Sequence, residues 1–322
     1  MIVAARATAR VQCAAPRARR HRSRRHRVAR ASSGVNDDDA SDAAMYEELE
    51  KINAANNSKS ASDWIGAWSK AITDPPSEAE VEKMRAAAMA AEEERLAEAR
   101  SYRYVFAHDL LSGSGDSFAG KYLKDALGMI DIELETPDLV CGNAEYTVSS
   151  ALEKLTAALN GGEGRKERPV RLIGSSTGAL VAALYAERNR DRVDKVFLLA
   201  PTWGLANILT NFEKSYGVNF SKAFVDDAST LPEYPTVTCP AYIVHGHDDD
   251  VSPLDNSARW MQMASQWMRQ EGDSDENVAE RRLLEVSGLG HGVETALPMS
   301  MGRFTEFFKI PRVDLYLRER EP

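Results

Sequence analysis

The stretch Gly174-Ser175-Ser176-Thr177-Gly178 constrains the fold of this chain more than any other feature. It follows the largely apolar run 169–173 and precedes a helical pattern over 179–186. A tight turn from strand to helix brings backbone close to the residue at its apex, so the positions two before and two after it need glycine. Only Ser176 has glycine at both positions. The pattern predicts a strand, a strained turn and a helix, with Ser176 as the candidate nucleophile.

A nucleophilic serine needs a histidine base and a carboxylate that orients the base, and both follow downstream. A buried-strand pattern over 240–244 ends in His245-Gly246-His247-Asp248-Asp249-Asp250-Val251-Ser252-Pro253. A further strand pattern over 282–286 is followed by Ser287-Gly288-Leu289-Gly290-His291-Gly292. The glycines around His291 predict a tight loop from which this side chain can reach the serine.

These motifs, in the order serine, aspartate, histidine, resemble the α/β-hydrolase superfamily, and within it small serine esterases and serine-aminopeptidase-like hydrolases with a minimal cap. The resemblance covers roughly residues 102 to 310. The aspartate loop is similar to the family pattern H-G-x-x-D-x-V-x-P, which implies Asp249 as the acid, with Asp248 and Asp250 as close alternatives. The implied chemistry is acyl transfer from an ester, thioester or amide to water, with His291 as the base.

The same resemblance implies an oxyanion hole made of two backbone N–H groups, those of Thr177 and Leu110. Leu110 belongs to His108-Asp109-Leu110, which follows a strand pattern over 104–108. Family members usually have glycine where this chain has Asp109, and His108 is expected to buttress the loop. A carboxylate near a developing oxyanion is unfavourable unless it points away. Asp109 therefore leaves open a second interpretation, a slow or non-catalytic ligand-binding, receptor or scaffold protein on a hydrolase fold.

Two other site types fit the sequence less well. The cluster of His245, His247 and three aspartates has metal-ligating side chains, but no H-E-x-x-H or C-x-x-C partner appears elsewhere, so we expect no metal. The run 113–120 is glycine-rich, but its third glycine is out of register for G-x-G-x-x-G. We therefore expect no cofactor. We interpret His245 as a structural loop residue and 113–120 as a rim loop.

Strand and helix patterns alternate from residue 102 onward. Strands are expected near 103–108, 130–136, 169–174, 194–200, 240–246 and 282–287, and helices near 117–127, 144–160, 177–188, 254–271 and 296–309. This alternation predicts an α/β fold over 102–322, with a doubly wound, mostly parallel sheet of about six strands.

The segment 202–238 leaves room for a minimal cap of one or two short helices. Its apolar residues predict an apolar underside that faces the serine: Trp203, Leu205, Ile208, Leu209, Phe212, Tyr216 and Phe220. Such a surface favours a small-molecule acyl substrate with an apolar group.

Residues 1–36 contain ten arginines and no acidic residue, which is typical of an organelle transit peptide. We favour a chloroplast over a mitochondrion, with processing within Val28–Ser33. A nucleic-acid-binding arm would usually carry lysines and aromatic residues, and this segment has neither. Without these ten of the 40 basic residues the net charge falls from −9 to about −19, which disfavours nucleic acid and anionic membranes as partners.

Residues 37–101 are expected to form an acidic linker followed by a helical extension. A capping-box pattern at Ser77–Glu80 predicts the start of a helix that reaches Arg100. Its apolar face is thin, so a solvated surface helix is favoured over a protein-binding helix at 77–100. Cys13, Cys141 and Cys239 are dispersed, which argues against a disulfide scaffold. No stretch has the length and apolarity of a membrane-spanning helix.

Overall fold

In the computed structural model of the chain, the described residues are 77–111, 117–140, 146–161, 166–270 and 280–311. The predicted transit segment 1–36, the predicted linker that precedes the helical extension and the first half of the predicted rim loop lie outside these residues. The chain divides between Ser77 and Glu78, and all the strands and helices described below belong to the second part.

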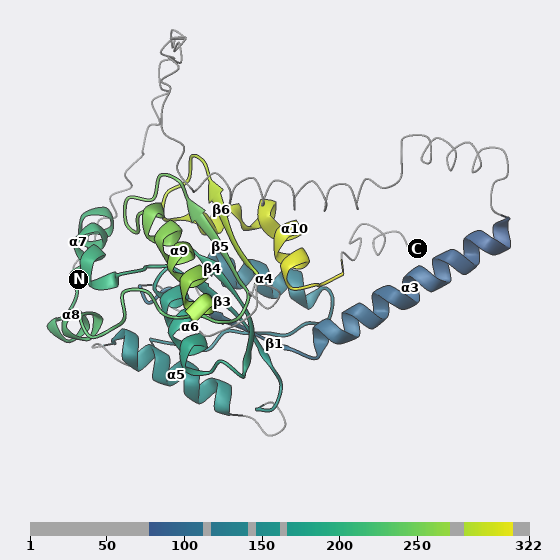
Figure 1. Cartoon of the computed structure of the whole chain (residues 1–322), viewed down its shortest axis with the longest axis horizontal. Helices are drawn as coiled ribbons and strands as arrows, with labels where there is room; N and C mark the ends of the chain where they lie inside the picture. The colour runs from purple at the N-terminus through teal and green to yellow at the C-terminus, as the bar shows by residue number, and fades with distance from the viewer. Residues whose placement is uncertain (1–76, 112–116, 141–145, 162–165, 271–279, 312–322) are drawn as a thin grey trace, which may run out of the picture. The chain divides into compact units, whose positions relative to one another are not determined.

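A six-stranded sheet forms the centre of the fold (Figure 1). Its strands are β1 (Arg103–Ala107), β2 (Leu134–Glu135), β3 (Val170–Ser175), β4 (Val193–Leu199), β5 (Ala241–Gly246) and β6 (Arg281–Val286). Their order is β2-β1-β3-β4-β5-β6, and every neighbouring pair is parallel. The predicted doubly wound parallel sheet is therefore confirmed.

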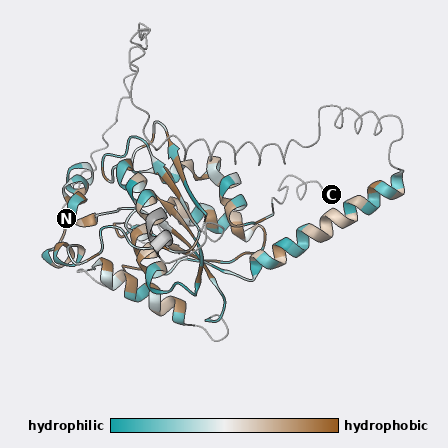
Figure 2. Ribbon diagram, in the orientation of Figure 1, coloured by the Kyte–Doolittle hydropathy of each residue, from teal (hydrophilic) through white to brown (hydrophobic). Residues whose placement is uncertain are grey.

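Alternating side chains of the strands pack into two cores, one on each face of the sheet. In β1, Val105 and Ala107 belong to one core, whereas Tyr104 and Phe106 belong to the other. Helices α5 (Val148–Asn160), α6 (Thr177–Arg188) and α9 (Leu254–Gln270) cover the first face. The second is covered by α4 (Phe118–Gly128), the 3-10 helix η2 (Val293–Ala296) and α10 (Leu297–Phe307). Because both faces of the central strands β3, β4 and β5 are buried, these strands are largely apolar (Figure 2).

The sheet reverses its direction of growth at β1. The chain runs from β1 through α4 to β2 on one side, and then crosses by α5 to β3 on the other side of β1. The carboxyl ends of β1 and β3 lie next to each other, with Ala107 paired to Gly174. Such a topological switch point opens a crevice beyond the strand ends, where ligands of α/β proteins bind.

The predicted cap contains two helices, α7 (Leu205–Tyr216) and α8 (Lys222–Ala228). Most of the large apolar residues of the cap pack into the first core and attach the cap to the sheet domain. These residues are Trp203, Leu205, Ile208, Leu209 and Phe212. Trp203 stacks on Trp260 with ring centroids 5.3 Å apart. Of the seven predicted residues, only Tyr216 and Phe220 remain partly or largely accessible, so the accessible apolar underside is smaller than expected.

Helix α3 (Glu78–Arg100) lies mostly in solvent. Only Leu96 and Ala99, near its C-terminus, are buried, whereas Met84 and Met89 are exposed. Figure 2 shows hydrophilic and hydrophobic residues mixed along its ribbon. Within the described part of the chain, no helix combines the length and apolarity needed to cross a membrane.

Candidate active site

Ser176 occupies a strained turn between β3 and α6. Its φ of 53° and ψ of −121° are rare for a residue with a side chain, and a hydrogen bond of 2.8 Å from its N–H to Leu199 O holds the turn. A Cβ on Gly174 would lie 2.6 Å from Ala179 Cα, and one on Gly178 would lie 2.2 Å from Ala107 O. Both glycines are therefore sterically required, as the sequence predicts.

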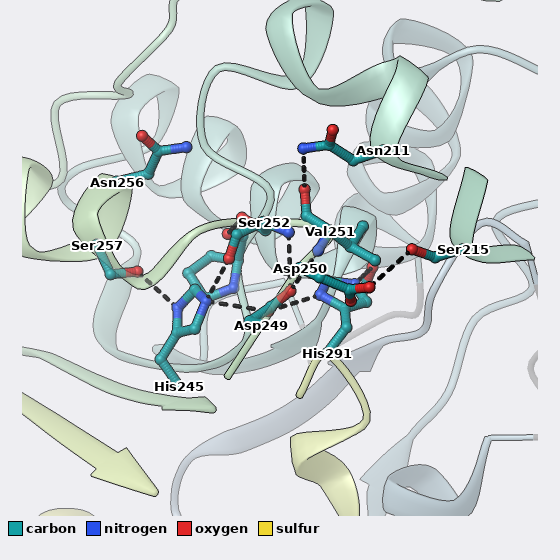
Figure 3. A network of polar contacts seen from close by, with 12 residues as sticks. Asn211, Ser215, His245, Asp249, Asp250, Val251, Ser252, Asn256, Ser257 and His291 are labelled. Atoms are coloured by element: carbon teal, nitrogen blue, oxygen red, sulfur yellow. Dashed lines mark hydrogen bonds and ion pairs between the residues drawn. The ribbon is translucent and has the colours of Figure 1, made fainter. Parts of the chain in front are cut away.

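Three of the predicted site residues lie in one hydrogen-bonded line. Ser176 Oγ is 2.8 Å from His291 Nε2, and His291 Nδ1 is 2.8 Å from Asp249 Oδ2. The two neighbouring aspartates point elsewhere: Asp248 pairs with His247 at 2.9 Å, and Asp250 accepts a hydrogen bond from Ser215 at 3.2 Å (Figure 3). The structure thus separates Asp249 from its neighbours, which the sequence distinguishes by register alone.

The Asp249 side chain is fully buried, and both of its oxygens accept hydrogen bonds. Its Oδ1 accepts hydrogen bonds from the N–H groups of Val251 (2.9 Å) and Ser252 (2.8 Å). Its Oδ2 faces His291 Nδ1 and also His245 Nε2, at 3.1 Å. Burial alone would raise the pKa of Asp249, but the hydrogen bonds from both histidines and from Ser252 hold this pKa well below its usual range. Asp249 is therefore a fixed carboxylate.

His245 lies inside β5, behind the acid, and not in the loop where we expected it. Its Nε2 is 2.7 Å from Ser252 O as well as near Asp249, so this nitrogen carries a proton. Its Nδ1 is 2.9 Å from Ser257 Oγ, which accepts a hydrogen bond from Trp203 Nε1. In the neutral Nε2–H tautomer, Nδ1 accepts a hydrogen bond from the Ser257 hydroxyl. The Nε2–H group then points at Ser252 O and Asp249 Oδ2, so Asp249 gains a further donor (Figure 3).

The loop after β5, which carries Asp249, and the loop after β6, which carries His291, are in close backbone contact. A Cβ on Gly246 would lie 2.2 Å from Gly290 O. Asp248 N–H donates to Leu289 O at 2.9 Å, and His247 N–H donates to Val286 O at 3.0 Å. These contacts join the loop that carries Asp249 to the loop that carries His291, which fixes the relative positions of the two side chains.

Of the two amides predicted for the oxyanion hole, that of Leu110 already has a hydrogen-bond acceptor within the protein. Leu110 N–H donates to Thr177 Oγ1 at 2.8 Å, so in this structure the amide is engaged by a side chain instead of facing the serine. The hydroxyl of Thr177 in turn donates to Asp109 Oδ1 at 2.8 Å, and this oxygen also accepts from Leu111 N–H at 3.1 Å. His108 buttresses the loop, because it contacts Asp109 O at 2.7 Å and accepts from Leu139 N–H at 3.0 Å.

Glu294 is a site neighbour that the sequence interpretation missed. Ser175 Oγ donates to Glu294 Oε1, and Ala119 N–H donates to Glu294 Oε2 at 3.2 Å. The carboxylate therefore connects the elbow, helix α4 and the 3-10 helix that follows His291. No sequence motif marks it, because these three partners meet only in the folded chain.

Two aromatic side chains of the cap lie beside His291. The rings of Phe212 and Tyr216 lie 5.4 Å and 6.3 Å from the His291 ring, in edge-on arrangements. Burial, followed by the nearby carboxylates of Asp109 and Asp249, raises the pKa of Tyr216. Phe212 also contacts Phe220, which links the base to a neighbouring cavity of about 330 Å³. That cavity is lined by Leu111, Tyr146, Val218, Asn219, Phe220, Ser221 and Phe224.

The described residues contain no cluster of three or more His, Cys, Asp or Glu side chains arranged to hold a metal ion.

No protein-family model and no curated protein matches the sequence. Solved structures do resemble it. A proposed hydrolase from Agrobacterium vitis S4 aligns with a TM-score of 0.50 at 16% identity, over 64% of this chain and 88% of its own. Est1E from Butyrivibrio proteoclasticus aligns with a TM-score of 0.48 at 17% identity, over 64% of this chain and 86% of its own. The Pyrococcus furiosus esterase Pf2001 aligns with a TM-score of 0.49 at 15% identity, over 65% of this chain and 82% of its own.

Proposed function

Given that the chain has the α/β-hydrolase fold, we propose that it is a serine hydrolase that cleaves an ester, thioester or amide of a small, partly apolar acyl substrate. One observation carries the proposal. On a strained elbow, Ser176 Oγ lies 2.8 Å from His291 Nε2, while His291 Nδ1 lies 2.8 Å from the buried carboxylate of Asp249. A serine hydroxyl, a base and an orienting acid in this arrangement are the elements of nucleophilic acyl transfer.

In the first half-reaction, Ser176 Oγ attacks the substrate carbonyl carbon as His291 Nε2 accepts the hydroxyl proton. Asp249 accepts the Nδ1 hydrogen bond, which fixes the tautomer and stabilises the imidazolium that forms. The carbonyl oxygen becomes an oxyanion, and the Thr177 N–H at the start of α6 is its proposed donor. His291 then gives its proton to the leaving alcohol, thiol or amine, and an acyl-serine ester remains.

In the second half-reaction, water attacks the acyl-serine carbonyl and gives a proton to His291 Nε2. The tetrahedral intermediate collapses, His291 returns the proton to Ser176 Oγ, and the carboxylic acid leaves. Every proton is thus transferred through one imidazole whose other nitrogen is held by Asp249.

The cavity of about 330 Å³ beside the oxyanion loop is the proposed site for the apolar group of the substrate. Phe220 and Phe224 stack with centroids 4.7 Å apart, and Tyr146 meets Phe224 edge-on at 5.7 Å. Leu111 joins this cavity directly to the loop of Leu110. Aromatic walls with a few polar groups suit a short acyl chain or a single aromatic ring.

Fluorophosphonate labelling with peptide mapping tests the proposal. We expect one adduct, on Ser176, and hydrolysis of short p-nitrophenyl esters. Ser176→Ala should lose the adduct and lower kcat by about a thousandfold or more. Ser229→Ala is the control, since it removes an exposed hydroxyl outside the elbow and should retain the adduct. A folded protein without an adduct on Ser176 would contradict the proposal.

A second candidate function, ligand binding with very slow turnover, is favoured by one contact. The amide of Leu110 is engaged by Thr177 Oγ1 at 2.8 Å, and a site with one oxyanion donor is a weak catalyst. Steady-state turnover separates the two candidates. Labelling of Ser176 together with ester hydrolysis below about 0.001 per second would favour the binding protein over the enzyme, for which roughly 1 to 1,000 per second is typical.

A further inference from the structure

The contact between Leu110 and Thr177 joins two segments that are 67 residues apart in the chain. Both residues are buried, and the N–H to Oγ1 distance is 2.8 Å. The hydroxyl donates its own hydrogen to Asp109 Oδ1, also at 2.8 Å. Since a hydroxyl has one hydrogen, this contact leaves a lone pair of Oγ1 aimed at the Leu110 amide.

The carboxylate of Asp109 is itself held in place. Its Oδ1 accepts a second hydrogen bond, from Leu111 N–H at 3.1 Å, and its backbone oxygen contacts His108 Nδ1 at 2.7 Å. The Thr177 hydroxyl therefore cannot turn away from Leu110 without giving up a charge-assisted hydrogen bond to Asp109.

We propose that Asp109 and Thr177 form a latch that occupies the second oxyanion donor, Leu110 N–H, until negative charge develops on the substrate. The latch rests on the proposed hydrolase function and adds to it two positioning residues, neither of which need touch the reacting atoms through its side chain.

The strength of the competing acceptors explains when the latch opens. A neutral ester carbonyl and a neutral hydroxyl are similar acceptors, so a bound substrate has little advantage over Thr177 Oγ1. An oxyanion makes a charge-assisted hydrogen bond that is roughly twice as strong. The amide therefore passes from Thr177 to the substrate in the transition state and not on binding.

The latch also stabilises the site when it is empty. A buried N–H without an acceptor is costly, and Thr177 Oγ1 supplies the acceptor. Removing the latch should therefore have opposite effects on stability and on activity. The protein becomes less stable, and the freed amide is available to substrate carbonyl and oxyanion alike. Consequently KM should fall while kcat changes little.

Four variants of the full chain test the latch, with p-nitrophenyl ester kinetics, the rate of fluorophosphonate labelling and thermal unfolding as readouts. Thr177→Val is nearly isosteric but lacks the acceptor, and Asp109→Ala releases the hydroxyl. Both should raise kcat/KM and the labelling rate about tenfold, mainly through KM, while Tm falls by about 3 °C. Thr177→Ser keeps the oxygen and Asp109→Asn keeps an acceptor, so both should stay within about twofold of the wild type.

Three results would overturn the latch. In the first, Thr177→Val and Asp109→Ala lower kcat/KM together with Tm, as a purely structural role requires. In the second, both leave kcat/KM unchanged. In the third, both Asp109 variants raise activity and Thr177→Val does not, which would mean that Asp109 acts by charge alone. Failure of the hydrolase function looks different: neither the wild type nor Thr177→Val would then show labelling that Ser176→Ala abolishes.

Discussion

His245 Nε2 lies 3.1 Å from Asp249 Oδ2, on the side of the carboxylate opposite to His291. The same oxygen is 2.8 Å from His291 Nδ1. The Asp249 carboxylate is thus held between two imidazoles, that of His291, which contacts Ser176, and that of His245, which is buried within the sheet. This arrangement assigns His245 a positioning role for Asp249.

Replacing His245 by Phe should lower kcat by about 10- to 100-fold, because the Asp249 carboxylate loses the hydrogen bond that His245 donates and its Oδ2 is less well fixed. His245→Gln keeps an N–H donor of similar reach and should recover most of the rate. Ester kinetics and urea unfolding of both variants check this. A Gln variant as slow as the Phe variant, with equal stability, would argue against the hydrogen bond as the cause.

Acid should remove the stabilisation that Asp249 provides. The native pKa of Asp249 lies below its ordinary value of 3.8, so the carboxylate contributes stability above that value and loses it as pH falls through the native pKa. The difference in unfolding free energy between the wild type and Asp249→Asn should be constant from pH 7 to about pH 4.5 and then narrow. Urea titrations at about pH 7, 5, 3.5 and 2.5 measure it, and a difference independent of pH would contradict the assignment.

Gly246→Ala should destabilise the protein by about 2 to 4 kcal/mol. Its Cβ would lie 2.2 Å from Gly290 O and 2.4 Å from Leu289 O, and neither backbone atom can move without separating the acid and base loops. Gly128→Ala is the control, since no atom lies within 4 Å of its Cβ position, and it should change stability by less than about 1 kcal/mol. Chemical denaturation of both variants gives the comparison.

Cys239 should resist alkylation in the folded protein. Burial raises the pKa of its thiol to about 12, so almost no reactive thiolate exists at about pH 8. Treatment with iodoacetamide, followed by peptide mapping, should show modification of Cys239 only after unfolding in urea. Rapid modification of the native protein would show that the thiol is accessible.

The sequence predicts the strands well where apolar runs are continuous, and less well at β2. The pattern over 130–136 suggests a full strand, but only Leu134–Glu135 pair with β1. Ile130 and Ile132 are buried in the second core, and Asp131 between them has a φ of 58°. Their apolar character reflects core packing and not strand pairing, a distinction that periodicity cannot make.

Local motifs predict Ser176 and His291 through the glycines around them, and Asp249 through its register in the family pattern. Glu294 and the contact from Leu110 to Thr177 carry no such local requirement. Their partners lie far away in sequence, as with the 119 residues between Ser175 and Glu294. The contact of His245 with Asp249 spans only four residues, but no motif marks it, and Ser257, which contacts the other ring nitrogen of His245, lies on α9.

The order of the strands has a consequence for thermal behaviour. Ser176 follows β3 in the middle of the sheet, whereas His291 follows β6, the last strand of the described sheet and one whose side chains are only partly buried. Strands at an edge open more readily than central ones. Gentle heating should therefore separate His291 from Ser176 while the centre of the sheet stays folded, and amide exchange in β6 should follow the loss of fluorophosphonate labelling more closely than exchange in β3.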